Sequence, residues 1–314
     1  MVDLIVNIAT AGRPDLLMRT LQSLAQCRLP SNYKQTIVIE NGPQTGAEEV
    51  VRSAPAVLNA RYQYCRQRNK SAALNVALGG LGDGLVFFTD DDVRFDAGVL
   101  VAYADAAETK GAGHFFGGPT DVDYEIPPPP WLEQYLPKSA RGWAWSGPDD
   151  HVSAPEFLGF NWAAFAADLR AAGGFNPDRG PGSLSGSTGQ ESEMQRRLLK
   201  HGLLGAYVPA AHVWHFVPTD CCSSKWAIAR NYRHGVEEGT RIATRKGPFG
   251  LPSWWMTRRY LKGIARILIW SFSPNPEQRF KAKYHRNYDR GLIHGMRCQC
   301  KSKKLKAANS PLLS

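Results

Sequence analysis

Three consecutive carboxylates are the feature of this sequence best suited to chemistry. Asp90, Asp91 and Asp92 follow directly on the apolar run 84–89, Gly-Leu-Val-Phe-Phe-Thr. Adjacent carboxylates at the end of a buried strand repel one another unless a cation lies between them. Ligands bind at the carboxyl ends of strands in open α/β sheets. The triplet therefore predicts a divalent metal site for Mg²⁺ or Mn²⁺, and the alternative is a solvated acidic turn before a helix near Asp96.

The periodicity of the first half of the chain predicts the elements that position these acids. Short apolar runs alternate with stretches whose apolar residues recur at helical spacing. Strands are expected at 4–9, 36–39, 62–65, 85–88 and 114–118, and helices at 14–25, 46–52, 69–78 and 96–108. Strands that alternate with helices predict right-handed βαβ units and a largely parallel sheet. The acids then end its fourth strand.

The second half of the chain is less regular. A long loop rich in proline and aromatic residues covers roughly residues 126–150, and such loops are usually functional or mobile. Order is expected to resume at 157–165 and 169–174, followed by a helix at 191–201, strands at 206–208 and 213–216, and helices from 224 onward, the middle one at 254–271. From about residue 301 we expect a disordered tail.

The composition fits one large domain, or one domain with an appendage. The 314 residues are 43% hydrophobic and 21% charged, which supports a sizeable core. No apolar run approaches the roughly 18 residues that span a bilayer, and the first residues read as a strand rather than a signal peptide. The six cysteines have neither a disulfide framework nor the paired spacing of a zinc site. We therefore expect a cytoplasmic protein with reduced thiols.

The charge is divided unevenly along the chain. The formal net charge is +10, with −6 in residues 1–224 and +16 in residues 225–314. A basic C-terminal third can attract anionic lipid, a phosphorylated acceptor or nucleic acid. Near its centre, Leu261, Leu268 and Phe272 recur at helical spacing among basic residues. This pattern fits either a helix in the interface of a membrane or a helix packed on the main domain with a solvated basic face.

Other motifs stand at the ends of the expected strands and the starts of the expected helices. In order they are 8–13 (IATAGR), 37–42 (IVIENG), 69–75 (NKSAALN), the acid triplet, 173–175 (GGF), 189–194 (GQESEM) and 208–215 (VPAAHVWH). This ordered set resembles that of family 2 glycosyltransferases of the GT-A fold, over roughly residues 3–220. The resemblance depends on the order and spacing of the motifs, since none of them is specific alone.

The resemblance implies roles for individual residues. We expect contacts with the nucleotide from Thr10, Arg13, Glu40, Lys70, Asp90 and Asp91, metal ligation by Asp92 and His215, and a catalytic base in Glu191. Asp91 could exchange roles with either neighbour. His212 and His215 face opposite sides of an extended chain, so only one of them can reach the metal, and the family motif selects His215.

The sequence departs from the family pattern at three places. Glu40 stands where Asp is usual, Leu74 stands where Arg or Lys often precedes Asn75, and Gln190-Glu191 replaces a Glu–Asp pair. Lys70 can supply the missing cation. A helix N-terminus keeps a carboxylate such as Glu191 ionised, as a general base requires. The alternative is that this residue merely favours the first turn of a helix.

The resemblance thus implies an α/β protein with a GT-A (Rossmann-like) fold, whose mixed, mostly parallel sheet is flanked by helices. We expect a catalytic domain at 1–220, with a nucleotide-binding half at about 1–120 and an acceptor half at about 121–220, a helical basic extension at 221–300 and a disordered tail at 301–314. The expected activity is metal-dependent transfer of a sugar from a UDP- or GDP-sugar to a glycan or lipid-linked acceptor, with inversion at C1. Nucleic acid is not expected as a partner. Peripheral attachment to the inner face of the membrane stays open.

Several alternatives remain open at this point. Aromatic faces stack on sugars, so Trp143 and Trp145 in the long loop, with Trp131 and Tyr135, are candidates for contacts with the sugar or the acceptor; they could equally form a small satellite core. A second class of function is a non-catalytic protein with the same fold that binds an anionic membrane or polyanion through its basic third. A third is a phosphatase, which would carry its paired acids on the first strand rather than the fourth.

Overall fold

The computed structural model describes residues 2–154, 156–183, 189–246, 254–270 and 272–308. The chain divides into two compact units, and each is described by itself. The first comprises Met1–Glu125 and Pro137–Val217, and the second comprises Ile126–Leu136 and Pro218–Ser314. The second unit therefore takes a short segment out of the expected long loop. No helix in the described part of the chain is both long enough and apolar enough to cross a membrane.

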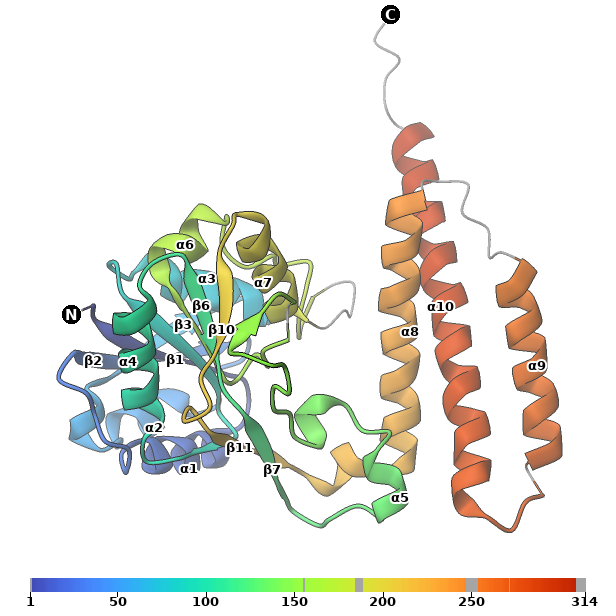
Figure 1. Cartoon of the computed structure of the whole chain (residues 1–314), viewed down its shortest axis with the longest axis horizontal. Coiled ribbons are helices and arrows are strands. Elements are labelled where there is room, and N and C mark those ends of the chain that lie inside the picture. Colours follow the sequence, from blue (N-terminus) through green and yellow to red (C-terminus); the bar gives the residue numbers. More distant parts are fainter. Residues whose placement is uncertain (1, 155, 184–188, 247–253, 271, 309–314) are drawn as a thin grey trace, which may run out of the picture. The chain divides into compact units, whose positions relative to one another are not determined.

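A mixed sheet forms the centre of the first unit (Figure 1). In the described residues it has eight strands in the order β3-β2-β1-β4-β9-β6-β10-β8. Their bounds are β1 Leu4–Thr10, β2 Tyr33–Asn41, β3 Ala60–Cys65, β4 Leu85–Asp90, β6 His114–Gly117, β8 His151–Val152, β9 Trp162–Phe165 and β10 Leu204–Tyr207. Strands β1 to β4 run parallel to one another, β6 is parallel to β10, and β9 and β8 are antiparallel to their neighbours.

Helices cover both faces of this sheet, as Figure 1 shows. They are α1 Pro14–Leu24, α2 Ala47–Arg52, α3 Lys70–Gly79, α4 Val99–Lys110, α6 Ala166–Ala171 and α7 Gln190–Lys200. All seven residues of β1 are buried, because its alternate side chains enter two separate cores. Ile8 joins the core that contains Leu17 of α1 and Tyr103 of α4. Ile5 joins the opposite core, with Ala77 of α3 and Leu198 of α7.

A second, smaller sheet lies in the same unit. Its order is β5-β11-β7, from strands β5 Val93–Phe95, β11 Val213–Val217 and β7 Thr120–Tyr124. Strand β11 pairs antiparallel with β5 and parallel with β7. The backbone N–H of Phe216 in β11 donates to the carbonyl of Asp92 at 2.8 Å. This sheet therefore joins the segment after β4 to a strand more than a hundred residues later.

The second unit is helical. Its helices are α5 Pro130–Glu133, α8 Ser224–Lys246, α9 Trp254–Trp270 and α10 Pro276–Ala308, with α10 between α8 and α9 (Figure 1). The short segment from the long loop packs here, because the rings of Trp131 and Tyr135 lie 5.4 and 5.0 Å from that of Phe280 in α10. The Tyr135 hydroxyl donates to Glu277 at 2.9 Å.

The expected mixed, mostly parallel sheet flanked by helices is confirmed. Each strand and helix predicted in the first half of the chain is present, with ends that shift by a few residues. Within the ordered segment expected at 157–165, residues Trp162–Phe165 form strand β9. Strands β5, β7 and β8 were not predicted. Residues 301–308 of the expected tail fall in α10, and residues 309–314 lie outside the described residues.

Candidate active site

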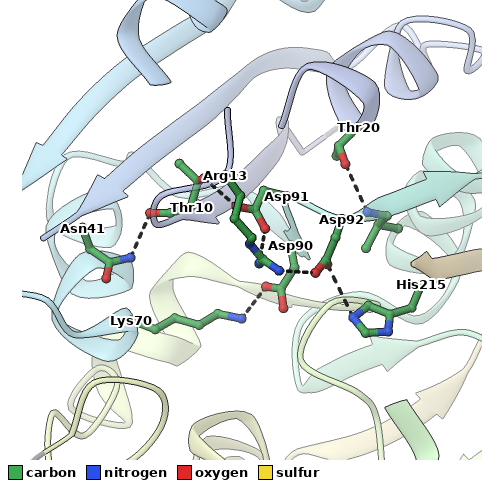
Figure 2. Close-up of polar contacts among 10 residues, drawn as sticks. Thr10, Arg13, Thr20, Asn41, Lys70, Asp90, Asp91, Asp92 and His215 are labelled. Atoms are coloured by element: carbon green, nitrogen blue, oxygen red, sulfur yellow. Dashed lines mark hydrogen bonds and ion pairs between the residues drawn. The ribbon is translucent and has the colours of Figure 1, made fainter. Parts of the chain in front are cut away.

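The three acids occupy the turn between β4 and β5, at the carboxyl end of the main sheet (Figure 2). Asp90 ends β4, and Val93 begins β5. The turn is held from α1, since the buried Thr20 hydroxyl accepts a hydrogen bond from the N–H of Val93 at 3.1 Å. Asp91 is fully buried, Asp92 is 8% exposed and Asp90 is partly exposed. Three neighbouring carboxylates that are so little exposed to solvent require positively charged groups beside them.

Arg13, in the turn between β1 and α1, supplies one such partner (Figure 2). Its guanidinium forms ion pairs with Asp91 and, at 2.6 Å, with Oδ2 of Asp92. The hydroxyl of Thr10 donates to the other oxygen of Asp91 at 2.5 Å. Burial raises the pKa of Asp91 to about 6, although Arg13 opposes that rise. The structure thus places two of the expected nucleotide contacts on the acids themselves.

His215 of β11 faces the remaining oxygen of Asp92. The distance from His215 Nε2 to Asp92 Oδ1 is 3.5 Å. On its other side, His215 Nδ1 lies 2.7 Å from the carbonyl oxygen of Ser139, which can only accept. Nδ1 therefore donates to that carbonyl, and Nε2 is the ring nitrogen that faces the carboxylate. The ring is fixed further by Phe160, stacked on it at 4.4 Å with an interplanar angle of 13°.

A cation fits between Oδ1 of Asp92 and Nε2 of His215. Oδ1 of Asp92 is buried and has no hydrogen-bond partner in the described part of the chain. Carboxylate and imidazole groups are common metal ligands in proteins. A metal-binding histidine typically donates its other ring N–H to a backbone carbonyl or a carboxylate, as His215 does to Ser139. Residues 2–154, 156–183, 189–246, 254–270 and 272–308 contain no group of three or more His, Cys, Asp and Glu side chains arranged for a metal. Mg²⁺ is commonly held by one or two carboxylates together with phosphate oxygens and water.

Lys70 connects the acids to the expected base. It is the first residue of α3 and forms an ion pair with Asp90 (Figure 2). Burial works to lower the pKa of Lys70, but the neighbouring carboxylates of Asp90, Glu191 and Asp92 together raise it, and the net direction is upward. Glu191 lies in the first turn of α7, and a Cβ placed on Gly159 would come within 3.2 Å of its carboxyl carbon. Glu191 is therefore packed on the backbone of Gly159, within electrostatic reach of Lys70.

Helix α7 is clamped in this position by side chains further along it. Gln195 is fully buried and forms two hydrogen bonds with the backbone of Phe157, at 3.0 and 3.2 Å. Arg197 donates to the carbonyls of Ala172 and, at 2.6 Å, Gly174, and also pairs with Glu193. These bonds fix α7 to the segment that contains Gly159 and to the GGF motif. They fix the position of Glu191 from two sides.

Glu40, another expected nucleotide residue, has both carboxylate oxygens bound by neighbouring side chains. It is 1% exposed at the end of β2. One oxygen accepts from the N–H and the hydroxyl of Thr45, at 2.7 and 2.8 Å, and the other accepts from Tyr62 at 2.7 Å. Glu40 thus orders the loop after β2. The neighbouring Asn41 donates to the carbonyl of Thr10 at 3.0 Å and ties β2 to β1 (Figure 2).

The four aromatic residues of the long loop are divided between the two units. Trp131 and Tyr135 pack in the second unit, whereas Trp143 and Trp145 lie against a core of the first. The Trp143 ring meets Phe157 and Tyr207, each at 5.9 Å, while Nε1 of Trp145 donates to the carbonyl of Asp149 at 2.8 Å. Both tryptophans therefore pack against one of the two main cores of the first unit, and their contact with a sugar or an acceptor stays a prediction.

Several residues that shape the site were not expected from the sequence. Ser139 acts through its backbone carbonyl, which no sequence signal reveals. Phe160, Gln195 and Arg197 read as ordinary core or helix residues until their partners are known. Asn161 is fully buried and donates to the carbonyls of Pro119 and Ala211, at 2.8 and 2.9 Å. It joins β9 to the loops that lead into β7 and β11, the strand of His215.

Comparisons with known proteins identify the fold. No protein-family model and no curated protein sequence matches this chain. Solved structures do. The mannosyltransferase PcManGT from Pyrobaculum calidifontis, in complex with GDP-Man and Mn²⁺, matches with a TM-score of 0.52 and 15% identity, over 99% of this chain and 79% of that one.

Two other solved structures agree. GalNAc-T7 with UDP, GalNAc and Mn²⁺ has a TM-score of 0.54 and 13% identity, over 87% of this chain and 58% of that one. TarS from S. aureus has a TM-score of 0.53 and 13% identity, over 92% of this chain and 55% of that one. This chain thus spans less than two thirds of the length of the latter two proteins. At these identities the likeness establishes the fold, which is of the GT-A type.

Proposed function

We propose that this protein is a metal-dependent glycosyltransferase that moves a sugar from a nucleoside-diphosphate sugar to a hydroxyl group. The observation that carries the proposal is the buried Asp92 oxygen that lies 3.5 Å from His215 Nε2, at the carboxyl end of a GT-A-type sheet. Asp92 and His215 would hold Mn²⁺ or Mg²⁺. The bound ion would stabilise negative charge on a leaving diphosphate.

Two basic side chains of the first unit are suited to bind the phosphates of such a donor. Arg13 and Lys70 both lie on the acids, and each can turn a positive group toward the phosphates of a donor. Asp90 is the more exposed acid and is the candidate for the ribose or for a metal-bound water. Thr10 and Asp91 order Arg13, so their expected role at the nucleotide is an indirect one. Glu40 supports the loop that follows β2, where the base is expected.

Glu191 is the proposed general base. The acceptor oxygen forms a bond to C1 of the sugar as the bond from C1 to the diphosphate oxygen breaks. The bonding pair leaves with the nucleoside diphosphate, and the proton of the acceptor hydroxyl passes to the Glu191 carboxylate. Attack from the face opposite the leaving group inverts C1. The first turn of α7 and the backbone of Gly159 hold this carboxylate in place.

The acceptor is proposed as a glycan or a lipid-linked glycan. A lipid-linked acceptor is favoured by the net charge of +16 in residues 225–314, which suits an enzyme that works at an anionic surface. A non-catalytic protein that binds such a surface is the rival function. It predicts no turnover of any donor, so the same experiment separates the two.

The test is a donor screen that measures nucleotide release. UDP- and GDP-sugars are incubated with the full chain and with Mn²⁺, Mg²⁺ or a chelator. We expect release from at least one donor that requires a metal and is lost in Asp92→Asn. Absence of release and of nucleotide binding with every donor and metal would leave the non-catalytic function.

Glu191→Gln tests the base. General-base catalysis typically contributes 10²–10⁴-fold, so we expect turnover to fall by roughly that factor while donor binding, measured by calorimetry, stays within about twofold. The matched control is Glu48→Gln, because Glu48 also stands in the first turn of a helix and is exposed. Near-wild-type turnover of Glu191→Gln would assign the proton transfer to another group.

A further inference from the structure

Helix α9 carries a stripe of large, exposed apolar side chains. Trp254, Leu261 and Leu268 follow one another at seven-residue intervals, about two helical turns, so they lie on one side of the helix. They are 70%, 58% and 66% exposed. Ile269 is 69% exposed, and Phe272 just beyond the helix is 88% exposed. A contiguous stripe of this kind marks a surface that binds something, whereas single exposed apolar residues need no explanation.

The opposite side of α9 already has its partner. Gly263 faces α10, where a Cβ on it would lie 3.8 Å from the Cα of Arg286. Figure 1 shows α9 lying along α10 within the helical unit. Gly263 lies about half a turn around the helix from the apolar stripe. The stripe is thus not needed to hold α9 on its neighbour.

The polar residues beside the stripe are basic. Arg258 and Lys262 are exposed, and the sequence of α9 contains no Asp or Glu. The Arg258 guanidinium lies 5.9 Å from the ring centre of Trp254. Long basic side chains beside an apolar face, with Trp and Leu on that face, are the pattern of helices that lie in the headgroup region of a bilayer.

We propose that α9 lies in the interface of a membrane that contains anionic lipids. Trp254, Leu261 and Leu268 enter the boundary between headgroups and acyl chains, and Arg258 and Lys262 pair with lipid phosphates. No helix in the part of the chain that the structure describes is suited to crossing the bilayer, so the contact is made along the surface. The inference does not depend on the proposed transfer reaction.

Charge favours a membrane over a second copy of the chain. Residues 225–314 carry +16, so two such surfaces would repel each other, whereas an anionic bilayer attracts them. Near the surface, each Lys or Arg strengthens binding to acidic lipid by about fivefold. The apolar stripe adds a contribution that salt does not screen. Binding that has both components distinguishes an inserted helix from simple adsorption of a basic protein.

The test is sedimentation of the full chain with vesicles of phosphatidylcholine, alone or mixed with phosphatidylglycerol. We expect binding to the mixed vesicles and little to the neutral ones. Leu261→Ser/Leu268→Ser should weaken binding at least tenfold, and Val57→Ser, at a 54% exposed position of the first unit, should not. Arg258→Gln/Lys262→Gln should weaken it roughly 25-fold at low salt, and Arg52→Gln/Arg61→Gln, which removes the same charge from exposed positions elsewhere, should have much less effect.

A second measurement follows insertion directly. Lipids brominated on their acyl chains should quench tryptophan fluorescence in the bound protein, and Trp254→Phe should remove part of that quenching. The proposal is overturned if vesicles are not bound, or if the two-leucine variant binds as well as wild type. It is also overturned if the two-leucine variant abolishes self-association, which would assign the apolar stripe to contact between copies of the chain. Nucleotide release in solution, measured on the same variants, reports on the transfer reaction separately.

Discussion

At the scale of single residues, Arg13 lies against the acids but has room to change its position. Its guanidinium bridges Asp91 and Asp92, and so it neutralises the acids that a divalent ion would require. The Arg13 side chain is nonetheless 45% exposed, so it has room to leave them. We infer that Arg13 compensates the charge of the acids before the metal binds and then turns to the phosphates of the donor.

Replacement of Arg13 should therefore change metal and nucleotide binding in opposite directions. In Arg13→Ala, one Asp92 oxygen loses its competing partner and a nearby positive charge is gone. We expect Mn²⁺ to bind roughly tenfold more tightly in the absence of donor, and a nucleoside diphosphate to bind more weakly. Calorimetric titration of each ligand measures both effects.

Arg52→Ala is the control for Arg13→Ala, because it removes the same charge from an exposed helix position where Arg52 pairs with Glu48. It should leave both affinities unchanged. If Arg13→Ala binds Mn²⁺ no more tightly than wild type, Arg13 does not compete with the metal.

The sequence predicted those site residues whose chemistry is local. Three acids at a strand end are visible in a linear pattern, the family motif selects His215 over His212, and the structure brings Asp92 and His215 to 3.5 Å. The support of His215 could not be predicted, because Ser139 contributes a backbone carbonyl and Phe160 a ring from distant loops. Glu40 shows the converse, since a strand-end acid looks available until its partners Thr45 and Tyr62 are seen.

At the scale of elements, α8 and α10 cross in close backbone contact. Gly235 and Gly239 of α8 are four residues apart, as are Gly291 and Gly295 of α10. A Cβ on any of the four would meet a backbone oxygen of the other helix at 2.1 or 2.2 Å. Two glycines on the same face of each helix therefore allow the two backbones to approach.

Replacement of Gly239 by alanine should destabilise the protein, which is the opposite of the usual effect of Gly→Ala within a helix. Within a helix, Gly→Ala ordinarily stabilises by up to about 1 kcal/mol. At Gly239 the added methyl group would meet Leu292 backbone atoms, so we expect destabilisation by roughly 1–3 kcal/mol. Urea unfolding followed by circular dichroism measures it.

Gly263→Ala is the matched control for Gly239→Ala. Its nearest contacts would be ordinary ones at 3.8 Å on Arg286, so this variant should be neutral or more stable than wild type. Equal stabilisation of both variants would show that the helices do not approach through their glycines.

The elements were predictable where each carries its own pattern. The buried strand β4 and the amphipathic helices α1 and α7 could be recognised from local periodicity. The sheet formed by β5, β7 and β11 could not, because a three-residue strand such as Val93–Phe95 has too few residues for a period, and its partners are distant in sequence. Helix α3 was assigned correctly; Leu74 and Leu78 lie on its buried face, whereas Val76 is 48% exposed.

At the scale of the whole molecule, chemistry and charge are divided between two units. The residues of the candidate site all belong to the first unit, while the strongly basic sequence lies largely in the second. Each unit has its own packed core. A ligand at the site should therefore act on global stability through the first unit, since binding to the native state alone raises stability by mass action.

Thermal unfolding in the presence of Mn²⁺ tests whether Asp92 and His215 bind a metal ion, and it does so without measuring activity. At a free concentration of about 100 times the dissociation constant, a bound ion adds about 2.7 kcal/mol, which corresponds to roughly 5–10 °C for a domain of 150–250 residues. We expect such a rise in Tm for the wild type, its reversal by a chelator, and its loss in His215→Ala. His212→Ala is the control, because His212 lies three residues earlier and pairs with Asp121 at 3.0 Å instead of facing Asp92. Equal shifts in the two histidine variants would remove His215 from the metal site, and with it the observation on which the proposed function depends.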